Sequence, residues 1–105
     1  MNKLFAITAT GKSIRSFLDL RFGHAEYIVF YTPGGGEPEI VDNPYREEEN
    51  AGLKLAQLIE KKKADIIITG EVGPKVGEFL ERKKIQLVLP EEERIRVEDL
   101  IARIG

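Results

Sequence analysis

Residues 64–69 read Ala-Asp-Ile-Ile-Ile-Thr, and this short apolar run between two charged segments decides the fold. A continuous run of this kind is typical of a strand that is covered on both faces of a parallel sheet. Helical periodicity flanks it on both sides, over 50–63 and from Pro74 onward. The inward-facing residues are Ala51, Leu55, Leu58 and Ile59 in the first helix and Val76, Phe79 and Leu80 in the second. Another strand is predicted over 85–89, so helical crossovers link parallel strands.

The N-terminal part of the chain is predicted to be rich in strands. Alternating and β-branched residues indicate strands over 3–9, 25–32 and 37–42, and the turn at 33–36 makes the last two a hairpin. Residues 12–23 fit either a loop or a short helix, with Ile14, Phe17 and Leu18 facing inward. A helical stripe runs to the C-terminus through Val97, Leu100, Ile101 and Ile104.

The predicted order of elements is β-β-β-α-β-α-β-α. A meander followed by right-handed crossovers is satisfied by one five-stranded mixed sheet in the order 3-2-1-4-5, with strand 2 antiparallel and helices on both faces. This α/β arrangement resembles the ribonuclease H-like architecture. We find no internal repeat and no linker, so residues 1–105 are expected to form a single domain.

Composition excludes several classes of function. The net charge is −2, so no global field attracts the protein to nucleic acid or to an anionic membrane. No cysteine is present, which excludes thiolate nucleophiles and clusters held by thiolates. The N-terminal apolar run is too short for a signal sequence or a membrane span, and we expect a cytoplasmic protein.

The predicted strand order places a switch point between strands 1 and 4, where a crevice opens at their carboxyl ends. Three segments meet there by topology: 10–13, 21–24 and 70–74. Glycines, helix N–H groups and basic side chains at this rim favour an anionic ligand. The candidate binding residues are Thr10, Gly11, Lys12, Arg21, Phe22, Gly23, His24, Gly70 and Gly73. The alternative, without a binding function, is that these glycines only end strands and that the basic side chains are solvated.

The common catalytic motifs are missing. Gly11-Lys12-Ser13 ends like a P-loop, but Ala6 replaces the first glycine of that motif, so we reject an NTPase. Strand 1 lacks the carboxylates of a two-metal nuclease. His24 is the single histidine and is either a ligand to a preassembled metal cofactor or a simple hydrogen-bond donor. No acid and base pair can be named, so an enzyme is not expected.

A family resemblance rests on a series of short motifs in a fixed order. These are Ala6-Ile7-Thr8 with Gly11, Phe22-Gly23-His24-Ala25-Glu26-Tyr27 leading into Val29-Phe30-Tyr31, Asn43-Pro44, Gly52, Ala64-Asp65-Ile66-Ile67-Ile68, and Val72-Gly73-Pro74 with Leu80. Over about residues 3–89 the chain resembles the dinitrogenase iron–molybdenum cofactor biosynthesis family of accessory and carrier proteins. The chain departs from the family where many members carry histidine: it has Arg21 before the Phe-Gly pair and Glu49-Asn50-Ala51 at the first helix.

The resemblance implies a ribonuclease H-like fold and a small non-catalytic binding or carrier protein. Its ligand would be an anionic metal–sulfur cofactor of the iron–molybdenum type, another molybdenum or iron–sulfur cluster, or a precursor. The partners implied are this cofactor and the cofactor-assembly proteins. Without cysteine, the ligand would be held by charge, by N–H donors and by at most one imidazole, that of His24. The alternative is a protein-interaction or regulatory module of the same fold with no bound cofactor.

Overall fold

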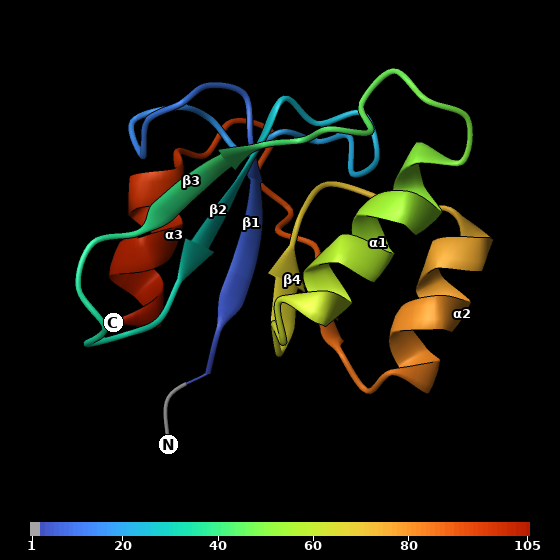
Figure 1. Ribbon diagram of the computed structural model, residues 1–105. Coiled ribbons are helices and arrows are strands. Elements are labelled where there is room, and N and C mark those ends of the chain that lie inside the picture. Colours follow the sequence, from blue (N-terminus) through green and yellow to red (C-terminus); the bar gives the residue numbers. More distant parts are fainter. Residues whose placement is uncertain (1–2) are drawn as a thin grey trace.

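The computed structural model describes residues 3–105, which form one five-stranded sheet and three helices (Figure 1). The strands are β1 (Phe5–Ala9), β2 (Tyr27–Tyr31), β3 (Glu39–Asp42), β4 (Ile66–Ile68) and β5 (Gln86–Val88). The helices are α1 (Ala51–Lys61), α2 (Pro74–Arg82) and α3 (Val97–Ile104). Every predicted strand and helix is present, and most begin or end a residue or two inside the predicted limits.

The sheet has the order β3-β2-β1-β4-β5, as the sequence predicts. β2 is antiparallel to both β1 and β3, whereas β4 is parallel to β1 and to β5. The apolar run at Ile66–Ile68 is fully buried between β1 and β5, which explains why it lacks the alternation of a half-exposed strand. The five-stranded mixed α/β sheet is therefore confirmed, while the ribonuclease H-like assignment stays a prediction.

Each face of the sheet has its own hydrophobic core. Helices α1 and α2 cover one face, where Leu55, Ile59 and Leu80 pack against the sheet. Helix α3 covers the opposite face through Val97 and Leu100 (Figure 1). The alternation of Ala6 and Ile7 along β1 sends neighbouring side chains into different cores. The prediction of helices on both faces is confirmed.

Residues 12–23 form a loop rather than a short helix. Leu18 is buried and Ile14 is half-buried against the α3 side of the sheet, as predicted. Phe17, which was also predicted to face inward, lies outside this core, and its ring packs against the guanidinium groups of Arg94 and Arg96. Isolated β-bridges join Ala9 to Leu18 and Phe17 to Arg96. These backbone contacts replace the helical hydrogen bonds that the segment lacks. Within 3–105, no helix has the length and apolar character required to cross a bilayer.

Both α1 and α2 begin at the end of the sheet where β1 and β4 end (Figure 1). This follows from the topology, because a helix that returns between parallel strands runs opposite to them. The positive ends of two helix dipoles therefore lie at one edge of the molecule. The candidate site is at this edge.

Candidate functional site

A cleft of about 560 Å³ opens at this edge. Three segments line it: the loop 21–24, the start of α1 and the start of α2 with the residues before it. The lining residues are Arg21, Phe22, Gly23, His24, Asn50, Gly52, Leu53, Glu71, Val72, Gly73, Lys75 and Val76. The prediction that 21–24 and 70–74 share one rim agrees with this arrangement, and a β-bridge joins Arg21 to Glu71 directly. The start of α1 is an addition that sequence reasoning did not include.

Both helix N-termini at the cleft carry unsatisfied N–H groups. The first helical hydrogen bonds are Lys54 N–H to the Asn50 carbonyl and Gly77 N–H to the Gly73 carbonyl, each 3.0 Å. The cleft residues that precede these bonds are Gly52, Leu53, Lys75 and Val76. Within residues 3–105, neither helix has a side-chain cap, and neither has an acidic residue in its first turn. Two uncapped N-termini at one cleft form a favourable environment for an anion.

Glycines allow these three segments to come close together. A Cβ on Gly23 would overlap the Gly52 amide nitrogen and lie 2.7 Å from the Gly52 Cα. A Cβ on Gly52 would lie 2.9 Å from Val76 Cγ2, across the contact between α1 and α2. Larger residues at these positions would push the loop and the helix ends apart. Packing therefore explains the Phe22-Gly23 pair, because Phe22 is buried in the core and Gly23 fits against the start of α1.

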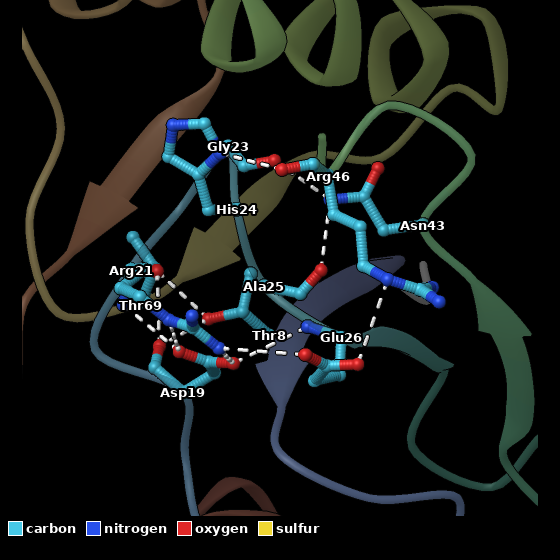
Figure 2. A network of polar contacts seen from close by, with 10 residues as sticks. All are labelled: Thr8, Asp19, Arg21, Gly23, His24, Ala25, Glu26, Asn43, Arg46 and Thr69. Carbon is cyan, nitrogen blue, oxygen red and sulfur yellow. Dashed lines mark hydrogen bonds and ion pairs between the residues drawn. The ribbon is translucent and has the colours of Figure 1, made fainter. Parts of the chain in front are cut away.

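Asp19 is a buried carboxylate that fixes the loop at the lip of the cleft (Figure 2). It accepts bonds from the Arg21 guanidinium at 2.9 and 3.0 Å and from the backbone N–H groups of Arg21 and Glu26. This hydrogen bond, with the charge of Asp19, raises the pKa of Arg21 further above its ordinary value. Glu26 lies 3.8 Å from the same guanidinium. Much of the charge predicted for ligand binding at Arg21 is thus already paired. Asp19 was missed because nothing in its sequence context indicates burial.

His24 is exposed at the lip of the cleft, and its ring orientation is fixed by the backbone (Figure 2). The Nδ1 atom lies 2.6 Å from the carbonyl oxygen of Arg46. Because a carbonyl only accepts, Nδ1 carries the proton, and in neutral imidazole the Nε2 lone pair remains free. This is the form in which histidine binds a metal. The hydrogen-bonding role predicted as the simpler alternative is therefore present, and it leaves Nε2 available.

Asn43 holds the backbone on either side of His24 (Figure 2). Its buried amide donates to the carbonyl oxygens of Gly23 and Ala25, at 2.8 and 2.9 Å, and its side-chain oxygen accepts from the N–H of Tyr45. Asn43-Pro44 belongs to the family pattern, and in the structure Asn43 positions the His24 segment.

The sequence matches the model of the dinitrogenase iron–molybdenum cofactor family over residues 2–105. The chain belongs to this family. The resemblance found in the sequence motifs is thus confirmed. No curated protein matches the chain.

Two solved structures of similar proteins share the fold. The apo form of the orange protein from Desulfovibrio gigas is 30% identical, with a TM-score of 0.86, over 97% of this chain and 86% of that one. A NifB-like protein from Thermotoga, assigned to the DUF35 family and solved by NMR, is 26% identical, with a TM-score of 0.80, over the same shares of the two chains. The family and these neighbours associate the chain with small proteins related to the iron–molybdenum cofactor.

The remaining predicted site residues lie away from the lining of this cleft. Thr10 donates its N–H to the Phe17 carbonyl, and the 10–18 segment is bonded to the start of α3 through Ser16 and Ile14. Gly11 and Lys12 belong to the same turn, beside the α3 face of the sheet. Gly70 packs against the Leu20 backbone and lines a smaller neighbouring depression. The structure therefore brings together Arg21, Phe22, Gly23, His24 and Gly73, but not Thr10, Gly11, Lys12 and Gly70.

The described residues contain no group of three or more histidine, cysteine, aspartate or glutamate side chains that could hold a metal ion. A bare ion would thus lack a ligand set here, because protein metal sites of this kind use three or four such donors. A preassembled anionic cluster has a different requirement, since N–H donors and positive charge can hold its outer atoms. The donor set of the cleft fits the second kind of ligand.

Proposed function

We propose that this protein is a small non-catalytic binding or carrier protein for an anionic metal–sulfur cofactor, of the iron–molybdenum type, or for a precursor of one. The ligand would occupy the cleft between the loop 21–24 and the starts of α1 and α2. One observation carries the proposal: two helix N-termini without side-chain caps open onto the same cleft, within 3–105. Membership of the family supports the class of ligand.

The residues suggest how such a ligand would be held. The free N–H groups at the starts of α1 and α2 would bond to its outer sulfur atoms, and the Lys75 ammonium would add positive charge. The free Nε2 of His24 would bind one metal of the cluster. Phe22, Leu53 and Val72 give the cleft an apolar wall, which suits a large and weakly hydrated anion. The partners proposed are proteins that assemble or receive the cofactor.

The test is an anaerobic titration with tetrathiomolybdate and, separately, with molybdate. The two anions share their metal, their charge of −2 and their tetrahedral shape, and differ only in sulfur against oxygen. We expect thiomolybdate to bind more than roughly tenfold tighter, because an apolar wall replaces the hydration of a sulfide surface more readily than that of an oxyanion. The change in visible absorption of the thiomolybdate measures its binding, and calorimetry measures binding of molybdate.

Equal affinity for the two anions would mean that the site binds anions in general and does not select a metal–sulfur ligand. Binding of neither would favour the alternative of an interaction or regulatory module with no cofactor. As an independent measurement, protein purified anaerobically from its natural host should carry molybdenum or iron together with a visible absorption band.

A further inference from the structure

We infer that Glu71 is the residue that limits how tightly the cleft holds its anion, and that it thereby favours release of the ligand. The inference rests on the proposed function, because it concerns the same cleft. Glu71 follows β4 and precedes the N-cap of α2, Gly73, by two residues. Its side chain is exposed and lines the cleft beside the start of the helix.

The charges at the cleft nearly cancel. The lysine, arginine and acidic side chains that line it are Arg21, Glu71 and Lys75. Arg21 is already paired with the buried Asp19 at 2.9 Å. Two opposite charges are then left, those of Glu71 and Lys75, and neither forms an ion pair with another residue in 3–105. The attraction for an anion therefore comes mainly from backbone N–H groups, and one carboxylate opposes it.

Within 3–105, the Glu71 carboxylate forms no hydrogen bond or ion pair that would stabilise the fold. The main chain at Glu71 is held by a β-bridge to Arg21, and the residue borders both the cleft and the neighbouring depression. Among the described residues, no side-chain hydrogen bond of Glu71 is formed, and it does not cap α2. Replacing it should leave the cores intact, which makes its effect on binding measurable.

A carboxylate close to a helix N-terminus is attracted by the same N–H groups that attract a ligand. Within 3–105 the Glu71 carboxylate forms no hydrogen bond with these N–H groups, so its charge remains exposed at the cleft and repels a bound anion directly. This repulsion weakens binding, because the ligand must remain beside the carboxylate. Weaker binding does not benefit a protein that only stores a cofactor. It does benefit a protein that must release the cofactor to another protein.

The experiment compares tetrathiomolybdate binding to the wild type, Glu71→Gln, Glu71→Asp and Glu91→Gln under anaerobic conditions. We expect Glu71→Gln to bind roughly five- to tenfold tighter at low ionic strength, as for one charge acting on a dianion across about 8 Å of water. Most of the gain should appear as slower dissociation. Glu71→Asp keeps the charge and should stay near the wild type. Glu91→Gln removes an exposed carboxylate that lines the neighbouring depression, which Glu71 also borders, but not the cleft itself, so it should change affinity clearly less than Glu71→Gln does.

Unchanged or weaker binding by Glu71→Gln would overturn the inference while the proposed function stood, since weaker binding would make Glu71 a direct contact of the ligand. Equal tightening by Glu91→Gln would also overturn it, because the effect would then come from net charge. Absence of binding to the wild type and to all variants would overturn the proposed function itself, and the inference with it.

Discussion

Two buried polar side chains, Asp19 and Asn43, shape the lip of the cleft. Each is at most 3% exposed, and together they bond to the backbone of 21, 23, 25, 26 and 45. Buried polar groups are tolerated only when their hydrogen bonds are made, so these two residues allow few other conformations of the loop. The orientation of the His24 segment therefore depends on two residues that do not line the cleft themselves.

Replacing Asn43 by alanine should test this role. The change leaves the carbonyl groups of Gly23 and Ala25 without their donor, and we expect a loss of about 1–3 kcal/mol in the free energy of unfolding. Urea denaturation followed by circular dichroism measures it. Gln57→Ala, at an exposed position of α1, is the control and should stay within about 0.5 kcal/mol of the wild type. A loss at Asn43 no larger than that of the control would contradict the proposed positioning.

A second residue-scale prediction concerns the ion pair between Glu92 and Arg103, which ties α3 to the segment before it. The hydrogen bond from Arg103 lowers the pKa of the Glu92 carboxyl. A lowered pKa in the folded state means that the pair stabilises the fold above the ordinary carboxyl pKa and loses this effect as the pH falls through the lowered value. In Arg103→Gln, NMR titration should find the pKa of Glu92 raised toward its ordinary value. An unchanged pKa would mean that the pair does not form in solution.

At the scale of elements, hydrophobic periodicity was enough to find every strand and helix. The run at 64–69 and the stripes of α1 and α2 depend on burial, and burial leaves a pattern in the sequence. The loop at 10–18 leaves no such pattern, because its position depends on backbone bonds from Val97 and Glu98 to Ser16 and Ile14. Because the sequence does not show where this loop lies, Lys12 was predicted at the rim of the cleft, whereas its turn lies on the α3 side of the sheet. Topology brought residues 21–24 and 70–74 to one rim, but it did not reveal that the Arg21 guanidinium is paired with Asp19.

The packing of α3 can be tested at Leu100, which is 5% exposed in the core that this helix covers. We expect Leu100→Ala to cost about 2–5 kcal/mol, because a buried leucine loses its contacts and leaves a cavity. Ile101 lies at the edge of the same core and is only half-buried, so Ile101→Ala should cost less. Thermal and urea unfolding of both variants measures the difference. A loss below about 0.5 kcal/mol for Leu100→Ala would mean that α3 does not pack as described.

At the scale of the whole molecule, the runs of like charge lie at opposite ends, with basic and acidic side chains mixed elsewhere. Runs of lysine and arginine at 61–63 and 82–84 follow the ends of α1 and α2, away from the cleft. Acidic runs at 47–49 and 91–93 lie near the cleft end, where Glu47, Glu48 and residues 91–93 line smaller depressions. The nearby acidic runs and the net charge of −2 therefore do not favour the approach of an anion from a distance. Attraction must come from groups in direct contact with the ligand.

This distribution of charge predicts how binding responds to salt. The Debye length falls from about 10 Å at 0.1 M to about 3 Å at 1 M, so added salt screens the distant acidic runs first. It weakens the attraction of Lys75 as well, but hydrogen bonds from helix N–H groups act at contact and are screened little. We therefore expect the affinity for tetrathiomolybdate to fall less than roughly tenfold between these two concentrations. Anaerobic titrations at both concentrations measure the change, and Lys75→Gln should make the dependence flatter still. A loss of a hundredfold or more, on the order of the response of proteins that bind by many lysine contacts, would contradict a site built from backbone N–H groups.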